Sequence, residues 1–318
     1  MPAKKIITVF GATGAQGGGL VRAILQDASS EFAVRAVTRD AQSDKAKALA
    51  QMGAEVVEAD IDDVESVKRA MDGAYGAYCV TFFWAHYSPE KEMNEAKNFA
   101  EAAKAKGLQH VIWSTLEDTR ILVPLSDDRM PTLNEKYKVP HFDGKGAADH
   151  FFSDAEVPVT FLMTAFYWEN LIYFGMGPKR GEDGKLAITF PMGNKKLVSM
   201  SAEDIGKCAY GIFKKGISLT GKRIGIAGDD PTCQEMADAL TTALGEKVVY
   251  NAITPQTFRS FGFPGADDLG NMFQYYADFE KEFAEARDID YARELNPALQ
   301  TFEMWLEKNA KRLPVEAS

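Results

Sequence analysis

The stretch IITVFGATGAQGGGL, residues 6–20, decides the fold. Its opening residues are apolar or β-branched and are typical of a buried strand. Glycines follow at positions 11, 14 and 17. The next apolar residues form one stripe of a helix: Leu20, Val21, Ile24 and Leu25. A GxxGxxG spacing between a strand and a helix is the setting in which a glycine-rich turn binds the pyrophosphate of a dinucleotide.

Each glycine has a separate role in that setting. Gly11 lets the chain turn sharply, Gly14 lets the backbone approach a pyrophosphate, and Gly17 lets the helix pack closely on the strand. The first N–H groups of the helix would then point at anionic oxygens. A glycine-rich tight turn that binds no ligand is the alternative interpretation.

Strands and helices continue to alternate through the first half of the chain. Short β-branched and apolar runs lie at residues 6–10, 33–38, 55–59, 77–81 and 111–114, with helix-like segments between them. Pro89 is expected to open a helix that ends at about Lys106, because Gly107 follows. Strands that alternate with helices pair in parallel through right-handed crossovers. We therefore predict an α/β fold, a Rossmann-type doubly wound parallel sheet with a smaller α+β C-terminal domain.

Composition narrows the class of protein. The 318 residues, 46% of them hydrophobic, can bury a large core without disulfides. The 36 Lys and Arg against 46 Asp and Glu give a net charge of -10, which disfavours a broad nucleic-acid-binding face. No apolar run approaches the roughly 18 residues of a membrane span. We expect one or two domains that contact neither nucleic acid nor membrane.

Cysteine use and the N-terminus indicate the compartment. Cys79, Cys208 and Cys233 have neither CxxC spacing nor a neighbouring histidine cluster, so we predict no disulfide framework and no metal site. The segment MPAKKIITVF has no long apolar region and no small-residue cleavage site. These features favour a cytoplasmic location.

The end of the second strand favours NADP(H) over NAD(H). An NAD site commonly carries an acidic residue about 20 residues past the glycines. Here Arg39 can form a fork of hydrogen bonds to a 2′-phosphate, and Lys45 adds positive charge. Asp40 as a ribose partner for NAD is the competing interpretation. Further contacts with the nucleotide are expected where the third and fourth strands end, at Asp60, Ile61 and Thr81. A solvated loop explains the first two almost as well.

Candidate catalytic residues follow the fifth strand. That strand ends in HVIWSTLE, which supplies Ser114 and Thr115, and His141 and Lys145 follow in an HxxxK spacing. An imidazole titrates near neutral pH and could donate a proton. A structural residue at the start of a helix is the alternative for His141. Lys145 is expected to hold the ribose hydroxyls beside the nicotinamide.

Several segments together resemble the NmrA-like family, an atypical branch of the short-chain dehydrogenases, and most closely its human-type NADPH-sensing members. They are VFGATGAQGG, VTRD, HVIWSTLED, HFDGKG, FYWENL and FGFPGADDLGNMFQYY. The resemblance covers nearly the whole chain. It implies an NADP-binding Rossmann domain, a smaller C-terminal domain and little or no dehydrogenase activity. Short-chain dehydrogenases use a YxxxK pair, whereas this chain has HxxxK, and Tyr137 lies four residues too early.

The resemblance also implies roles for single residues. The phosphate loop corresponds to Gly11, Thr13, Gly14, Ala15, Gln16 and Gly17. Arg39 corresponds to the 2′-phosphate contact and Lys145 to the ribose contact, and Tyr167 and Asn170 correspond to positions beside the nicotinamide. The chain departs from the family pattern between residues 120 and 139, where ILVPLSDDRMPTLNEKYKV predicts a lid or a loop insertion.

The second half of the chain predicts a smaller domain and a return to the first. We assign residues 1–163 and 198–228 to the NADP-binding domain, and 164–197 and 229–318 to the smaller domain. Residues 201–204 predict a capping box. Helices are expected at 231–244, 255–261 and 267–283, with a strand at 247–250. The dense aromatics between residues 166 and 174 could line a cleft or join the two domains.

Functions of different classes fit these features. The intact glycine loop and the missing tyrosine favour an NADP(H)-binding redox sensor or regulator that acts through protein partners. The alternative is an NADPH-dependent reductase of quinones or other small carbonyl or enone substrates, in which Lys145 or His141 replaces the tyrosine. A scaffold whose pocket is vestigial is a third hypothesis. A homodimer is compatible with each of them.

Overall fold

The centre of the protein is a sheet of seven parallel strands, seen in a computed structural model that describes residues 3–315. The strand order is β11-β6-β5-β4-β1-β2-β3. The strands are β1 (Lys5–Val9), β2 (Phe32–Thr38), β3 (Glu55–Glu58), β4 (Gly76–Cys79), β5 (His110–Thr115), β6 (Val159–Met163) and β11 (Arg223–Gly225). This order confirms the predicted Rossmann-type sheet. Because all the strands run in one direction, their carboxyl ends lie along one edge.

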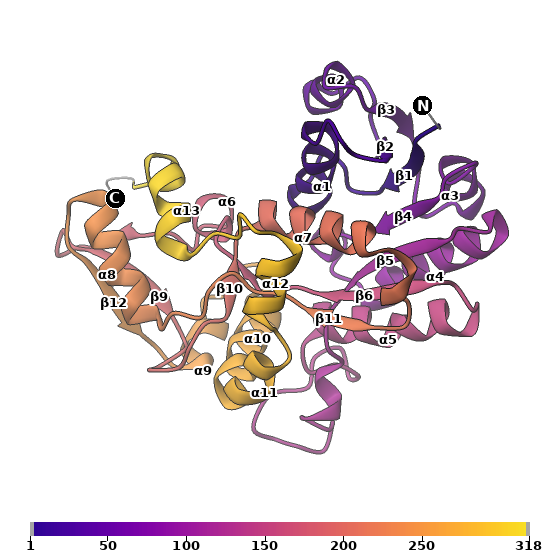
Figure 1. The fold of residues 1–318 in the computed structure, drawn as a ribbon. Helices are drawn as coiled ribbons and strands as arrows, with labels where there is room; N and C mark the ends of the chain where they lie inside the picture. The colour runs from indigo at the N-terminus through magenta and orange to yellow at the C-terminus, as the bar shows by residue number, and fades with distance from the viewer. Residues whose placement is uncertain (1–2, 316–318) are drawn as a thin grey trace.

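Helices cover both faces of the large sheet (Figure 1). One face carries α1 (Ala15–Gln26), α2 (Asp44–Gln51), α7 (Ala202–Lys215) and α12 (Ile289–Leu295). The other face carries α3 (Val64–Ala70), α4 (Pro89–Lys106) and α5 (Pro140–Asp154). Each layer has its own apolar core, so the sheet is buried on both sides.

The ends of α4 follow from its sequence, as predicted. The hydroxyl of Ser88 accepts the N–H of Lys91, and Pro89 occupies the first turn, where its missing N–H has no intrahelical partner in any case. At the other end Gly107 adopts φ +62, a left-handed conformation that most residues avoid. The predicted helix from Pro89 to Lys106 is confirmed.

Glycines allow α1 and α7 to touch through their backbones. A Cβ on Gly206 of α7 would lie 2.1 Å from the backbone nitrogen of Leu20, and a Cβ on Gly19 would lie 2.6 Å from the carbonyl oxygen of Glu203. Neither position can carry a side chain without separating the two helices. The segment 202–225 thus returns to the large sheet, with α7 packed on α1 and β11 paired with β6.

The rest of the second half forms a separate layer of small elements, at the left and bottom of Figure 1. A three-stranded sheet contains β8 (Lys179–Arg180), β9 (Leu186–Phe190) and β12 (Val248–Ala252), and β7 (Phe166–Tyr167) pairs with β10 (Ser199–Met200). The helices are α6 (Asn170–Tyr173), α8 (Cys233–Leu244), α9 (Pro255–Arg259), α10 (Ala266–Asp278), α11 (Glu280–Glu285) and α13 (Phe302–Asn309). Short 3₁₀ turns lie at Phe83–Ala85, Thr119–Ile121, Gly216–Leu219 and Ala310–Arg312.

The capping box predicted at residues 201–204 is wrong. Ser201 is the N-cap of α7, but its hydroxyl donates to the carboxylate of Glu169 at 2.9 Å and makes no bond to the helix. Glu169 also accepts the N–H of Ala202 at 2.8 Å. A carboxylate from another part of the chain therefore takes the place of the local cap. A capping box forms at Thr232 and Glu235 instead.

The structure also differs from the expectations for the helix at 267–283 and for the aromatic residues at 166–174. The single helix expected at 267–283 is two helices, α10 and α11. The helix breaks at Phe279, whose backbone adopts φ -122 and ψ 38. The ring of Phe279 packs with its centroid 5.3 Å from that of Tyr275. The aromatic segment between residues 166 and 174 is not uniformly buried. Phe166 and Trp168 are buried in the core, whereas Tyr173 and Phe174 are 64% and 53% exposed.

Within residues 3–315, no helix is both long enough and apolar enough to span a membrane.

Because α1 and α7 touch through their backbones, adding a single methyl group at this contact should strongly destabilise the fold. Gly206→Ala should lower the free energy of unfolding by about 2–3 kcal/mol, because the new Cβ meets backbone atoms that cannot rotate away. Urea denaturation followed by circular dichroism measures this change. Lys214→Ala, an exposed substitution on the same helix, is the control and should stay within about 0.5 kcal/mol of the native protein. Equal stability of the two variants would contradict the packing described here.

Candidate functional site

The glycine turn has the backbone geometry that a close ligand requires. Gly11 adopts φ +64 at the end of β1, and its carbonyl oxygen accepts the N–H of Gly14 at 2.9 Å. A Cβ on Gly17 would lie 2.5 Å from that same oxygen. The turn and the first turn of α1 are therefore pressed together, as the sequence predicts for Gly11 and Gly17.

The N-terminus of α1 is open to an anion. Gly14 is the N-cap and brings no side chain to the first N–H groups, and the first turn contains no acidic residue. These N–H groups have no acceptor within the helix and lie at the positive end of its dipole. Ala15 and Gly14 are exposed there, and Thr13 is partly exposed. The arrangement can bind a phosphate or pyrophosphate.

The side chain of Gln16 links the turn to three strands. Its amide nitrogen donates to the phenol oxygen of Tyr167 at 2.6 Å, and its amide oxygen accepts the hydroxyl of Ser114 at 2.8 Å and the phenol of Tyr78. Thr164 also contacts the Tyr167 oxygen at 3.0 Å. Burial raises the pKa of Tyr167 to about 12, so this phenol keeps its proton at neutral pH. The sequence predicts Gln16 and Tyr167 separately, and the structure joins them.

His141 is oriented by a carboxylate from the second half of the chain. Its Nδ1 lies 2.6 Å from Oδ1 of Asp268, and its backbone N–H donates to Oδ2 of the same residue at 3.2 Å. Both side chains are buried, and the Trp84 ring packs 4.8 Å from the imidazole. The carboxylate pairs with Nδ1 and so leaves Nε2 as the nitrogen that can exchange a proton with a ligand.

Lys145 lies one turn after His141 on α5, so both side chains are on the same face of the helix. Its ammonium donates to the hydroxyl of Thr81 at 2.6 Å and lies 2.9 Å from Oε1 of Glu92, which is completely buried. These contacts fix the ammonium between α4 and α5. They favour a role for Lys145 in positioning a ligand.

The other predicted cofactor contacts lie at the expected strand ends. Arg39 and Lys45 are exposed beyond the end of β2, and Asp60 and Ile61 follow β3, where the Ile61 carbonyl accepts the amide of Asn98 at 2.9 Å. Asn170 begins α6, directly after the strand that carries Tyr167. The structure thus places Arg39, Asp60 and Ile61 after the carboxyl ends of β2 and β3, whereas Asn170 follows a strand of the separate two-stranded sheet.

Two hydroxyl groups near the site have structural partners. Thr115 donates to the carboxylate of Asp149 at 2.6 Å, on the side of the sheet opposite Gln16. The phenol of Tyr137 donates to Glu90 at 3.0 Å, and burial raises its pKa to about 12. Tyr137 therefore does not replace the missing tyrosine.

The segment 120–139 is fastened to the protein at several points. The buried carboxylate of Asp143 accepts N–H groups of Thr119, Lys138 and Val139. The amide of Asn271 on α10 donates to the carbonyl oxygens of Pro131 and Lys138. These bonds are characteristic of a packed insertion and disfavour a movable lid.

The sequence alone does not reveal two partners of the predicted catalytic residues, Asp268 and Glu92. Asp268 lies within the ADDLGNMF segment that supports the family resemblance, but nothing in the sequence pairs it with a histidine 127 positions away. Glu92 has a weak local signal, because it lies on the same helical stripe as Ala96 and Phe99. In residues 3–315 no group of three or more His, Cys, Asp or Glu side chains is arranged to hold a metal ion.

The His141–Asp268 contact predicts a measurable link between α5 and α10. Asp268→Ala removes an acceptor for two N–H groups and leaves them buried, so the free energy of unfolding should fall by about 2 kcal/mol. Asp267→Ala is the matched control, because Asp267 is exposed in the same helical turn. Urea denaturation of both variants tests the link, and equal losses would show that the contact contributes nothing specific.

Comparison with known proteins identifies the family. The model of the NmrA-like family matches residues 3–306. The NmrA-like family domain-containing oxidoreductase cpsB of Aspergillus campestris is 28% identical over 290 residues, which cover 86% of this chain and 82% of that protein.

Solved structures share the fold. NmrA, a negative transcriptional regulator, matches in its complex with NAD with a TM-score of 0.77 at 23% identity, over 97% of this chain and 95% of that one. Its complex with NADP matches with a TM-score of 0.75. Triphenylmethane reductase of Citrobacter sp. complexed with NADP(H) matches with a TM-score of 0.73 at 20% identity, over 96% of this chain and 99% of that one. With a family match over nearly its whole length, this chain belongs to the NmrA-like family.

Proposed function

We propose that this protein binds NADP(H) and acts as an NADPH-dependent reductase of quinones or other small carbonyl or enone substrates. The observation that carries the proposal is a buried pair of side chains. His141 lies one turn before Lys145 on α5, and its partner Asp268 lies on α10. A carboxylate that orients an imidazole is an arrangement that enzymes use for proton transfer. The cofactor, when bound, supplies the hydride.

The open N-terminus of α1 supports nucleotide binding. The uncapped, acid-free first turn suits the pyrophosphate, and Gly14 allows the ligand close to the backbone. We assign the ribose next to the nicotinamide to Lys145, whose ammonium donates to Thr81 and lies 2.9 Å from Oε1 of Glu92. Tyr167 and Asn170 are assigned to the nicotinamide side. Structural relatives solved with NAD or NADP support the class of ligand.

Arg39 favours the phosphorylated cofactor. Its guanidinium is exposed beyond β2, where a 2′-phosphate would lie, and Lys45 is exposed near it at the start of α2. The competing residue, Asp40, uses its carboxylate within its own turn, where it accepts the N–H of Gln42 at 2.8 Å. Asp40 is therefore a weaker candidate for a ribose contact than the sequence alone suggests.

Substitution of Arg39 tests the choice of cofactor. Arg39→Ala should weaken NADPH binding by about tenfold to a hundredfold and leave NADH binding within about twofold, because only NADPH carries the 2′-phosphate. Fluorescence titration of the bound nucleotide measures both affinities. Arg69→Ala, which changes another exposed arginine, is the control. The preference for NADP(H) is wrong if the native protein binds NADH as tightly as NADPH.

A histidine can donate a proton in place of the missing tyrosine, so a reductase remains chemically feasible. Reduction of a carbonyl group takes a hydride to carbon and a proton to oxygen, and His141 can supply the proton from Nε2 while Asp268 stabilises the imidazolium. Lys145 then acts as the cation that holds the ribose. The relative from Aspergillus campestris is named an oxidoreductase, the same class of enzyme as the reductase proposed here.

A sensor that acts through protein partners is the second candidate function. The absence of the YxxxK tyrosine favours it. Such a sensor would respond to nucleotide occupancy rather than to thiol oxidation, because all three cysteines are buried. Burial raises the pKa of each thiol, to about 12 for Cys233, so none is a reactive thiolate at neutral pH. The domain division, the cytoplasmic location and a homodimer remain predictions.

A substrate screen with a histidine variant separates the two functions. NADPH oxidation with quinones, aldehydes and enones should exceed about one turnover per second for at least one substrate. His141→Gln should lower kcat by about a hundredfold and leave NADPH affinity nearly unchanged, because it removes the proton donor. His150→Gln, an exposed histidine on the same helix, should have no effect. Absence of turnover with every substrate, together with nucleotide-dependent binding of a protein partner, would support the sensor.

A further inference from the structure

Lys145 belongs to a group of polar and ionisable side chains that are mostly buried. The group consists of Thr81, His86, Glu92, Glu95 and Lys145, and we name it the Glu92 cluster. Glu92 is 0% exposed and Glu95 is 4% exposed. Two buried carboxylates are costly unless each is paired or protonated. This arrangement needs an explanation beyond packing.

The first half of the cluster fixes the lysine. Thr81 donates its hydroxyl proton to Oε1 of Glu92 at 2.7 Å and accepts an N–H of Lys145 at 2.6 Å, while the ammonium itself lies 2.9 Å from the same Oε1. These three contacts form a closed triangle between the segment after β4, α4 and α5. Glu92 thereby determines where the ammonium of Lys145 lies, although Glu92 is too deeply buried to touch a ligand.

The second half of the cluster contains polar atoms that lack partners. Oε2 of Glu92, Oε2 of Glu95 and Nε2 of His86 are buried and make no hydrogen bond to any other residue in the range 3–315. Nε2 of His86 lies 3.6 Å from Oε1 of Glu95. Buried polar atoms without partners are rare in proteins and mark places where a proton or a water molecule is shared.

Glu95 changes its charge near neutral pH. Burial, and then the negative charges of Asp62 and Glu92, raise its pKa to about 7. The charged groups that face it are Asp62 after β3, His86 before α4, Lys91 and Glu92 on α4, and Lys145 on α5. Burial lowers the pKa of His86, so this neighbour is neutral at the pH where Glu95 titrates.

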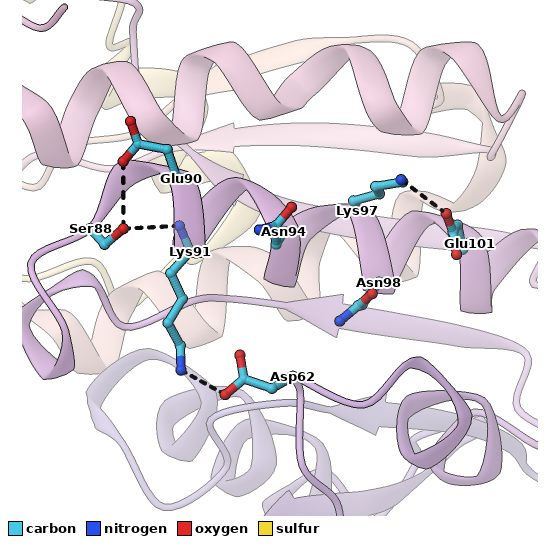
Figure 2. Close-up of a pocket in the computed structure, with 8 residues that line it drawn as sticks. All are labelled: Asp62, Ser88, Glu90, Lys91, Asn94, Lys97, Asn98 and Glu101. Atoms are coloured by element: carbon cyan, nitrogen blue, oxygen red, sulfur yellow. Dashed lines mark hydrogen bonds and ion pairs between the residues drawn. The ribbon is translucent and has the colours of Figure 1, made fainter.

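A surface groove lies along α4 next to Glu95 and is lined by its chain neighbour Asn94. Lys91, one turn earlier on α4, reaches across to Asp62 at 2.6 Å, and Figure 2 shows this ion pair at the edge of a surface groove. The groove has a volume of about 670 Å³ and is lined by polar residues that include Asn94 and Asn98. Exposed ion pairs are weak, so we expect protons to reach Glu95 from the side of this groove.

We propose that Glu92 is the positioning residue that holds Lys145 in place for the ribose of NADP(H), and that ionisation of Glu95 reduces the attraction of Lys145 for the anionic nucleotide. The proposal rests on the NADP(H) binding proposed above and does not require turnover. When Glu95 is protonated, Lys145 has one carboxylate partner and retains net attraction for an anionic nucleotide. When Glu95 ionises, a second negative charge faces the same ammonium. NADPH affinity should therefore fall as the pH rises through about 7.

A double-mutant cycle on Glu92 and Lys145 tests the positioning role. Lys145→Met and Glu92→Gln should each weaken NADPH binding by about tenfold, and the double variant should bind no more weakly than Lys145→Met alone. Fluorescence titration of NADPH gives the four dissociation constants. Additive losses of about a hundredfold in the double variant, or an unchanged affinity in either single variant, would overturn the proposal. Thr81→Val, which breaks the same triangle, replaces Glu92→Gln if that variant does not fold.

The pH dependence tests the role of Glu95. In the native protein NADPH affinity should decrease by about fivefold between pH 6 and pH 8, and Glu95→Gln should remove most of this change. Glu101→Gln, at an exposed position of the same helix, is the control and should keep the native profile. A native profile in Glu95→Gln would overturn this part of the proposal. If the native protein does not bind NADPH at all, the proposed function itself has failed, which is a different result.

Discussion

The close contact of α1 with its surroundings is the constraint on which the rest of the structure depends. On one side Gly17 leaves only 2.5 Å between a Cβ and the carbonyl oxygen of Gly11, and on the other side Gly206 brings the backbone of α7 onto Leu20. The helix is thus fixed at the end of β1 with its first N–H groups directed outward from the sheet. A strand, a turn and a helix held this tightly leave the first N–H groups of α1 without a side-chain acceptor, which is the basis of the proposed nucleotide site.

Charged pairs complete the site by joining the second half of the chain to the carboxyl edge of the sheet. Asp268 holds His141, and Arg287, whose side chain is fully buried, contacts Glu117 after β5 through both of its terminal nitrogens and donates to the carbonyl oxygen of Thr164. Buried ion pairs of this kind fix the positions of the side chains they join, but they add little to the stability of the fold. The residues proposed for proton transfer are therefore positioned by α10, far away in sequence.

Local patterns in the sequence were sufficient for the frame of the fold. The strand runs, the Pro89–Lys106 helix and the glycine turn are each encoded by neighbouring residues, and the structure confirms them. Pairings across long separations were not predictable. Ser201 was expected to cap its own helix, but Glu169 accepts its hydroxyl from 32 positions away. In the sequence Glu92 looks like any charged residue of a polar helix. Only the packing of α5 on α4 shows that it pairs with Lys145.

A crystal structure with NADPH bound tests the central claim most directly, because that claim assigns one ligand to the turn after β1 and to the residues on α5. The account predicts the pyrophosphate at the first turn of α1 and the nicotinamide ribose within about 3 Å of the Lys145 ammonium, with His141 beside the ring. A nucleotide that binds at the turn but directs its nicotinamide away from α5 would contradict it.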